Sequence, residues 1–352
     1  MTIHNFSAGP CILPQEVFKK AAAAVLNFND LSILEISHRS KDFVAVMEQA
    51  QSLALEHLGL QNKGYQAIFL GGGASMQFLM VAYNLLENKA AYLNTGTWSS
   101  NAIKEAKAFG EVIEVGSSKE ANFNYIPKGY TIPSDVDYFH CTSNNTIFGT
   151  QIKDFPDTAV PVICDMSSDI FSKVMDFTKF DLIYAGAQKN MGPAGATLIV
   201  VKEEILGKVS RHIPSILDYQ VHIAKESMFN TPPVFPVYVS MLTLDWLKNN
   251  GGIAAIEKLN NEKAALIYNE IDRNELFQGF AAVDDRSTMN ATFSLNDEAH
   301  TAAFDTLWKG AGISGLNGHR SVGGYRASMY NALPLASVQA LVDSMQELER
   351  KG

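Results

Sequence analysis

The chain is poor in cysteine, has no excess of positive charge and contains no long apolar run. Its only cysteines are Cys11, Cys141 and Cys164, which are widely spaced and form no CxxC pair. An odd number of scattered cysteines argues against a disulfide framework or a zinc site, and predicts reduced thiols. The formal net charge of −9 argues against binding to the backbone of a nucleic acid. No apolar run is long enough to cross a bilayer, so we expect no membrane segment.

Common nucleotide motifs are also absent. The sequence contains neither GxGxxG nor GxxxxGK[ST], and without GxGxxG and its ribose-binding acid it does not predict an NAD-dependent oxidoreductase. Residues 1–14 lack the basic and apolar regions of a signal peptide, so the sequence predicts a cytoplasmic protein.

What the chain does have is a regular alternation of short apolar segments and helical patterns between about residues 67 and 201. This alternation predicts right-handed βαβ units and a mainly parallel sheet that is covered by helices on both faces. The predicted strands are 67–70, 91–93, 112–115, 138–141, 160–164, 182–185 and 196–201.

Helical spacing of apolar residues predicts further elements. Asp42 is the predicted cap of a helix that Gly59 ends, and segment 229–236 is predicted to lack regular structure. The other predicted helices are 15–26, 75–86, 101–109, 241–248, 253–271, 298–309 and 335–348, with strands near 280–283 and 291–295.

These patterns predict an α/β protein with two domains. We expect residues 1–14 to lie near the domain junction and residues 15–250 to form a large domain around a mainly parallel central sheet. Residues 251–352 are predicted to form a smaller α+β domain.

Lys189 lies between two apolar runs, in a stretch that continues through Gly192, Pro193 and Gly195. Burying an ammonium is costly unless it is paired or its pKa falls. A lysine in a dry pocket can form a Schiff base with an aldehyde such as pyridoxal phosphate, PLP. The alternative is an ordinary lysine at a strand end that reaches solvent.

Other residues follow predicted strands. Asp165 comes directly after segment 160–164, so it should lie with Lys189 on the sheet edge where α/β proteins bind ligands; its alternative role is a helix cap. Trp98 could stack on a cofactor ring or be an ordinary core aromatic. The segment Gly71-Gly-Gly-Ala-Ser75 could present backbone N–H groups to an anion at a helix N-terminus, or form a tight structural turn.

Arginine is scarce, so its placement is informative. His38-Arg39 and His319-Arg320 form two His-Arg pairs, and Arg326 lies a few residues after the second pair. Guanidinium groups match phosphate and carboxylate oxygens in pairs. Each pair alone could be a surface feature, but together they fit a small substrate with both a phosphate and a carboxylate.

With these motifs in view, the chain resembles the phosphoserine aminotransferases, a family of fold-type I PLP enzymes in the class V aminotransferase group. The resemblance covers nearly the whole chain. It is carried by the segments Asn5-Phe-Ser-Ala-Gly-Pro10, Glu35-Ile-Ser-His-Arg39, Gly71 to Ser75, Ala185-Gly-Ala-Gln-Lys-Asn190, Met228-Phe-Asn-Thr-Pro-Pro233, Gly318-His-Arg-Ser-Val-Gly-Gly324 and Arg326-Ala-Ser-Met-Tyr-Asn-Ala332. Small departures at Ser75-Met76 and Cys141-Thr142 affect no proposed ionic role.

The resemblance implies a role for each cofactor residue. Lys189 would carry PLP as a Schiff base and move the proton between Cα and C4′, while Asp165 would pair with the pyridine nitrogen. Trp98 would stack on the ring and Thr146 would contact its hydroxyl side. The residues implied for the cofactor phosphate are Ala74, Ser75 and Gln188, with Asn230 and Thr231 from the partner subunit of a homodimer.

The resemblance also implies the substrates. Arg326 would bind the substrate α-carboxylate, helped by Ser7. The substrate phosphate, or the side-chain carboxylate of glutamate, would be held by His38 and Arg39 together with His319 and Arg320 of the other subunit. The implied reaction converts 3-phosphohydroxypyruvate and L-glutamate into O-phospho-L-serine and 2-oxoglutarate in L-serine biosynthesis, by ping-pong half-reactions through pyridoxamine phosphate. Whether the enzyme also accepts the four-carbon phosphorylated substrate of pyridoxine biosynthesis stays an open question.

Two rival enzymes are weighed against this interpretation. A serine–glyoxylate aminotransferase of the same class would have no use for two His-Arg pairs. A cysteine desulfurase would need a catalytic cysteine on a mobile loop near the small domain, whereas Cys11, Cys141 and Cys164 lie elsewhere. No nucleic acid, membrane or metal ion is expected as a partner.

Overall fold

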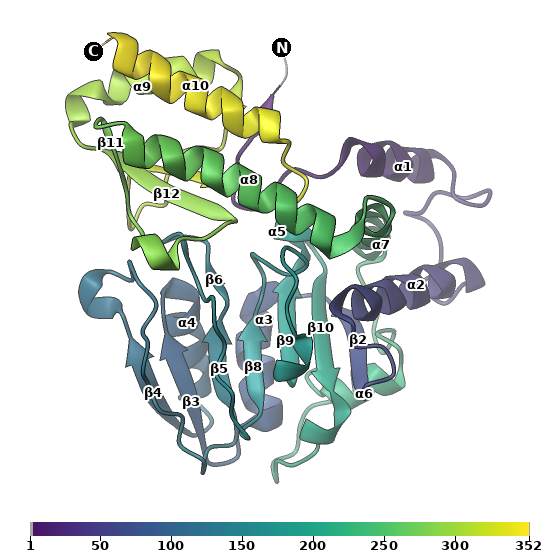
Figure 1. The fold of residues 1–352 in the computed structure, drawn as a ribbon. Coiled ribbons are helices and arrows are strands. Elements are labelled where there is room, and N and C mark those ends of the chain that lie inside the picture. The colour runs from purple at the N-terminus through teal and green to yellow at the C-terminus, as the bar shows by residue number, and fades with distance from the viewer. Residues whose placement is uncertain (1–2, 352) are drawn as a thin grey trace.

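The computed structural model describes residues 3–351, and its main feature is a seven-stranded sheet in the order β2-β10-β9-β8-β5-β3-β4 (Figure 1). Residues 1, 2 and 352, which belong to the predicted segments 1–14 and 251–352, lie outside the described residues. The strands of this sheet are β2 (Tyr65–Leu70), β3 (Lys89–Asn94), β4 (Glu111–Ser117), β5 (Phe139–Thr142), β8 (Val162–Asp165), β9 (Leu182–Gly186) and β10 (Thr197–Lys202).

The sheet is mainly parallel, as the alternation predicts. β4, β3, β5, β8 and β9 pair in parallel, whereas β10 runs antiparallel to both β9 and β2. Only residues 187–196 connect β9 to β10, which is too short for a crossover to a parallel strand. The connection carries Lys189, so the reversal of the chain places this lysine at the carboxyl end of β9.

Helices cover both faces of the sheet because neighbouring side chains of a strand point to opposite sides. In β10, Leu198 and Val200 belong to one core and Ile199 and Val201 to the other. α2 and α7 pack on the first core, while α3 and α4 lie behind the sheet on the second (Figure 1). The helices of this part are α1 (Gln15–Leu26), α2 (Lys41–Leu58), α3 (Gly73–Leu85), α4 (Thr97–Ala106), α5 (Ala187–Asn190), α6 (Tyr219–Ala224) and α7 (Val234–Asn249).

The start of α2 corrects one prediction. The cap is Ser40, whose hydroxyl accepts a hydrogen bond from the Phe43 N–H at 3.3 Å, and not Asp42. Asp42 lies in the first turn, where its carboxylate accepts from Asn29 Nδ2 at 2.9 Å. The predicted end is confirmed: Gly59 adopts a left-handed conformation with φ 63°, which glycine does at little cost.

Two other helix starts were misplaced. α7 begins at Val234, inside segment 229–236, because a proline in the first helical turn loses no hydrogen bond and Pro236 is tolerated there. α4 begins at Thr97 rather than 101, and the Ser99 hydroxyl accepts from the N–H groups of Thr95 and Gly96 at its start. Trp98 therefore lies in the first turn of a helix.

A smaller α+β unit follows α7. Its three-stranded antiparallel sheet has the order β11 (Phe277–Gly279), β12 (Asn290–Leu295) and β14 (Tyr325–Ser328). The strand predicted near 280–283 is wrong: β11 ends at Gly279, and Val283–Asp285 forms a 3-10 turn. The helices are α8 (Gly252–Arg273), α9 (Thr301–Gly310), preceded by a 3-10 turn at Glu298–His300, and α10 (Leu335–Lys351). A boundary between residues 250 and 251 stays a prediction.

The N-terminal segment joins the two units. β1 (His4–Asn5) pairs in parallel with β13 (Ile313–Ser314) of the small unit, and the Cys11 N–H donates to the Gln188 carbonyl of the large one at 3.0 Å. A short hairpin of β6 (Asn144–Asn145) and β7 (Thr150–Gln151) lies beneath the small sheet (Figure 1). The remaining 3-10 turns are Lys119–Ala121, Phe177–Lys179 and Glu203–Ile205. Within residues 3–351, no helix combines the length and the apolarity that a membrane crossing needs.

Candidate active site

Lys189 lies in α5, a single helical turn that directly follows β9. Its Nζ donates a hydrogen bond to Thr146 Oγ1 at 2.8 Å and lies 5.6 Å from the centre of the Trp98 ring. The side chain keeps some exposed surface, yet desolvation lowers the pKa of Lys189 to about 8, with nearby Asp165 opposing this and Arg326 adding to it. A substantial fraction of the amine is therefore neutral near physiological pH, as a nucleophile requires.

Asp165 is the last residue of β8, in the strand next to β9. Its side chain is buried, and its Oδ1 accepts from the Ser167 N–H at 2.9 Å. Burial raises the pKa of Asp165, and the positive charge of Lys189 opposes this shift. Both interpretations of Asp165 therefore have a structural basis. Its Oδ1 caps the turn that follows β8, and its negative charge raises the pKa of Lys189.

Two buried donors near Lys189 lack partners. Among the described residues, neither Trp98 Nε1 nor Arg326 Nε has a hydrogen-bond acceptor. Arg326 lies in β14, and desolvation lowers the pKa of its guanidinium. A buried guanidinium without a carboxylate partner is costly unless an anion completes it, so this position suits a substrate carboxylate.

The glycine-rich segment forms the start of α3. Gly72 caps the helix with φ 91° and Gly73 follows with φ 67°, so both need the left-handed conformation that glycine allows. Ala74 and Trp98 pack against the same core, while Ser75 is exposed. The first N–H groups of a 13-residue helix thus face the site side of the sheet.

The His-Arg pairs lie in two places. His319, Arg320 and Arg326 are close in one chain, since both arginines lower the pKa of His319 after the larger effect of desolvation. His38 is partly buried, and its Nε2 has no hydrogen-bond partner among the described residues, whereas Arg39 and Arg320 are exposed.

The other predicted residues differ in how close they lie to Lys189. Asn230 and Thr231 are exposed in the segment before α7. Gln188 is partly buried beside Lys189, and Ser7 lies against Gly315 of the small unit, where an added Cβ would lie 2.3 Å from its hydroxyl. The single chain therefore brings Lys189, Asp165, Thr146, Trp98 and Arg326 together, and the roles of all the site residues stay predictions.

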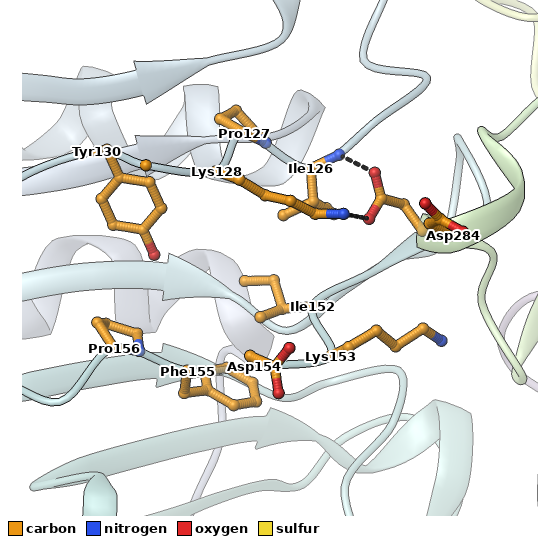
Figure 2. A pocket seen from close by; sticks show the side chains of 12 residues that line it. Ile126, Pro127, Lys128, Tyr130, Ile152, Lys153, Asp154, Phe155, Pro156 and Asp284 are labelled. Carbon is orange, nitrogen blue, oxygen red and sulfur yellow. Dashed lines mark hydrogen bonds and ion pairs between the residues drawn. The ribbon is translucent and has the colours of Figure 1, made fainter.

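A cavity of about 430 Å³ lies elsewhere, between segments 126–130 and 152–156 and the turn Val283–Asp285 (Figure 2). Two of its charged residues pair with each other: Lys128 Nζ lies 3.3 Å from Asp285 Oδ1, and Asp285 Oδ2 also accepts from the Ile126 N–H at 2.9 Å. None of the predicted site residues lines this cavity, so it is distinct from the Lys189 site.

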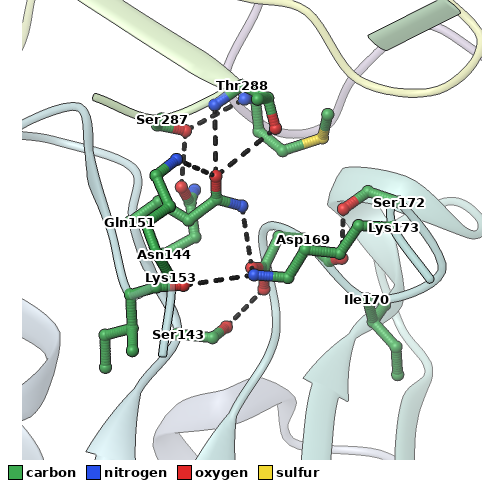
Figure 3. Close-up of polar contacts among 12 residues, drawn as sticks. Ser143, Asn144, Gln151, Lys153, Asp169, Ile170, Ser172, Lys173, Ser287 and Thr288 are labelled. Atoms are coloured by element: carbon green, nitrogen blue, oxygen red, sulfur yellow. Dashed lines mark hydrogen bonds and ion pairs between the residues drawn. The ribbon is translucent and has the colours of Figure 1, made fainter. Parts of the chain in front are cut away.

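Sequence reasoning missed several residues next to the site. The thiol of Cys11 donates to the carbonyl oxygen of Lys189, and burial raises the pKa of Cys11 to about 12. Ser143 donates to Asp169, which lies four residues after Asp165, and both residues are buried (Figure 3). No motif or spacing marks them, because their partners come from distant segments; the sole local signal is the polar run Ser143-Asn-Asn-Thr146 after an apolar strand.

Comparison with known proteins gives the class. Residues 3–341 match the aminotransferase class-V family, and the chain belongs to that family. A phosphoserine aminotransferase of Flavobacterium psychrophilum is 71% identical over 355 residues that cover 100% of both chains. The solved phosphoserine aminotransferase of Bacillus circulans subsp. alkalophilus has a TM-score of 0.96 at 42% identity and covers 99% of each chain. A PLP-bound phosphoserine aminotransferase of Trichomonas vaginalis has a TM-score of 0.91 at 34% identity, covering 98% of this chain and 100% of its own.

The residues present fit PLP. A PLP site needs a lysine amine, a carboxylate for the pyridine nitrogen and an anion site for the phosphate. Lys189 and Asp165 lie at the ends of adjacent strands, each with the pKa shifted by burial, and the N-terminus of α3 follows β2. Trp98 Nε1 and Arg326 Nε also have no hydrogen-bond acceptor in the described part of the chain, so both donors are free to bind another group.

Proposed function

We propose that this chain is a PLP-dependent phosphoserine transaminase that interconverts 3-phosphohydroxypyruvate plus L-glutamate and O-phospho-L-serine plus 2-oxoglutarate, in L-serine biosynthesis. The observation that carries the proposal is the arrangement of Lys189 and Asp165 at the carboxyl ends of β9 and β8, with Arg326 of β14 near the lysine. Supporting it, relatives of that name match the chain from end to end. We place the enzyme in the cytoplasm.

Lys189 is the catalytic residue. With its lowered pKa, part of the amine is neutral near pH 8, so Lys189 would hold PLP through its aldehyde group and would carry a proton to and from the substrate Cα. The hydrogen bond to Thr146 fixes the position of Nζ. When bound, PLP supplies an electron sink for the negative charge that develops at Cα, and the carboxylate of Asp165 strengthens that sink by keeping the pyridine nitrogen protonated.

The cofactor phosphate is assigned to the start of α3, where Ala74 and Ser75 present backbone N–H groups to an anion. Gln188 adds a side-chain amide beside Lys189. Asn230 and Thr231 are exposed and precede α7, which suits a contribution to the second site of a homodimer, and we propose that the two sites of the dimer are composite in this way.

Two cationic groups bind the two anionic ends of the substrate. Arg326, which is partly buried and whose Nε has no acceptor among the described residues, binds the α-carboxylate, with Ser7 nearby. The phosphate goes to His38 and Arg39 with the partner's His319 and Arg320. A serine–glyoxylate aminotransferase needs only the first of these sites, so the second cluster favours a phosphorylated substrate.

The test is an absorbance spectrum of the purified protein loaded with PLP. We expect a visible band that bleaches with L-glutamate and returns with 3-phosphohydroxypyruvate. A band that returns only with glyoxylate or pyruvate would place the chain among other aminotransferases. A protein that gives no band after incubation with PLP would contradict the roles of Lys189 and Asp165. Adding the four-carbon phosphorylated keto acid to the same assay tests the pyridoxine branch.

A further inference from the structure

A buried carboxylate outside the assigned machinery lies directly behind the site. Asp169 is 4% exposed and lies in the turn that follows β8, four residues after Asp165. Both its carboxylate oxygens are engaged: Ser143 Oγ donates to Oδ1, and Gln151 Nε2 donates to Oδ2 at 3.1 Å (Figure 3). Lys173 Nζ lies 3.9 Å from Oδ2 as its counter-ion.

The partners of Asp169 belong to the segment that carries Thr146. Ser143 follows β5 and also bonds the backbone carbonyl of Asp165, through its N–H at 3.0 Å and its hydroxyl at 3.1 Å. Thr146 comes three residues later and accepts the hydrogen bond from Lys189. Asp169 and Ser143 therefore link the segment that carries Asp165 to the segment that carries Thr146, and both of those residues lie near Lys189.

The same turn is also fixed by amides from elsewhere in the fold. Asn190, next to Lys189, donates to the Ile170 carbonyl at 2.6 Å. From the small unit, Asn331 donates to the Phe171 carbonyl at 2.9 Å and Asn260 to the Ser172 carbonyl at 3.1 Å. On its other side, Gln151 Oε1 accepts from the Thr288 N–H at 3.3 Å (Figure 3). The turn after Asp165 is thus held from both units, with Asp169 at its centre.

We propose that Asp169 is a positioning residue, whose buried carboxylate fixes the spacing between Asp165 and Thr146 and places a negative charge behind Lys189. The inference rests on the proposed PLP function. The charge of Asp169 raises the pKa of Lys189 and of Asp165, though neither effect is the largest on those groups. The charged and titratable groups that interact with Asp169 are Asp165, Lys189, Lys173, Lys153 and Cys164, while Arg326 and Cys11 act on Lys189 as well.

The experiment compares three variants of the PLP-loaded protein. Asp169→Asn (D169N) removes the charge and replaces one carboxylate oxygen by an NH2 group, so that one of the donors Ser143 Oγ and Gln151 Nε2 loses its acceptor. Ser143→Ala removes the bridging hydroxyl and keeps the charge. Asp137→Asn is the matched control: Asp137 accepts from the N–H groups of Glu87, Asn88 and Lys89 at the amino ends of the strands, away from the site.

Three quantities are measured: the thermal midpoint, the affinity of the cofactor-free protein for PLP, and the pH midpoint of the absorbance of the bound cofactor. D169N should lower the pH midpoint, because losing a nearby negative charge disfavours the protonated form, and weaken PLP binding about tenfold. Ser143→Ala should weaken PLP binding with little change in the pH midpoint. Asp137→Asn should lower the thermal midpoint alone.

The proposal is overturned if D169N changes only the thermal midpoint, as the control does, or if Ser143→Ala binds PLP like the unmodified protein. Should D169N fail to fold, the Ser143→Ala result decides. Failure of the proposed function has a different signature, because the unmodified protein would then give no cofactor band or no response to the phosphorylated keto acid.

Discussion

The Nζ of Lys189 donates a hydrogen bond of 2.8 Å to the hydroxyl of Thr146, a residue 43 positions earlier in the chain. The lysine follows β9, while Thr146 follows the β6 strand after β5. The contact therefore depends on the order of strands in the sheet and defines where the reactive amine points. The predictions below start from this amine.

Lys189→Ala should abolish transamination, with a loss on the order of 10⁴-fold or more, because no other described group can replace its amine. The check is the absorbance band with PLP together with the rate of glutamate-dependent amino transfer. Lys202→Ala is a suitable control, since Lys202 lies at the far end of β10 and pairs with Glu204. A Lys189→Ala protein that still turns over would refute the assignment.

The capture of PLP by the cofactor-free protein should depend on pH with a midpoint near 8. A pKa of about 8 for Lys189 leaves about one tenth of the amine neutral at pH 7. The capture rate should rise through that range and level off above it. In Asp165→Asn the midpoint should fall, since the carboxylate raises the pKa of Lys189. Stopped-flow absorbance measures both, and a midpoint near the ordinary lysine value of 10.5 would contradict the desolvated site.

Arg326→Ala and Arg320→Ala should affect the two substrates differently. Arg326 is assigned to the carboxylate that both substrates carry. Its loss should therefore lower kcat/KM for each of them by an amount equivalent to about 2–4 kcal/mol of transition-state stabilisation. Arg320 is assigned to the anionic group at the other end of the substrate, so its loss should raise KM most for 3-phosphohydroxypyruvate, whose phosphate carries the larger charge, and much more than it disturbs PLP binding. Steady-state kinetics with each substrate varied in turn separate the cases. Equal effects of Arg320→Ala on binding of PLP and of substrate would contradict the phosphate site.

Gly72→Ala should disturb the start of α3. Gly72 has φ 91°, and a Cβ there would lie 2.7 Å from Cβ of Met76. We expect a loss of about 1–3 kcal/mol in the free energy of unfolding, with weaker PLP binding. Gly71→Ala is the matched control, because a Cβ at Gly71 meets nothing within 4 Å. Denaturant unfolding and PLP titration of both variants test this, and equal behaviour of the two would dismiss the conformational argument.

Lys263 gives a prediction about stability. It is fully buried in α8 and donates to the carbonyls of Met329 and Tyr330 at 2.9 and 2.8 Å, and desolvation lowers its pKa to about 7. Between that value and 10.5 the unfolded chain binds more protons, so stability should rise with pH. Relative to Lys263→Met, the native protein should gain about 1–3 kcal/mol between pH 7 and pH 9. Lys258→Met, an exposed site on the same helix, should show no such trend in denaturant unfolding.

The sequence predicted the sheet and the site edge because both depend on local patterns. Asp165 and Lys189 each follow an apolar run, and adjacent parallel strands bring such positions together. The pattern fails where conformation depends on a single residue: the prolines of segment 229–236 predict irregular structure, whereas Pro236 lies in the first turn of α7. It failed for the strand near 280–283 because β11 is only three residues long.

The polar surroundings of the site could not be predicted. Asp169 bonds to Ser143 and Gln151, and the turn around it bonds to Asn260 and Asn331, which are 88 and 160 residues from their partners. Such contacts follow from the packing of the two units and have no local periodicity. The contributions of Asn230 and Thr231, and those of His319 and Arg320, concern a second subunit and stay predictions.

The pairing of β1 with β13 has a consequence for the order of biosynthesis. His4 lies beside Ile313, and a few residues later Cys11 bonds to the chain at Gln188 and Lys189. The β1 residues thus leave the ribosome long before their strand partner is made. The seven-stranded sheet can form while the small unit is still being translated, but β1 can pair only after β13 has emerged. Completion of the site around Lys189 is therefore a late event in the maturation of each new chain.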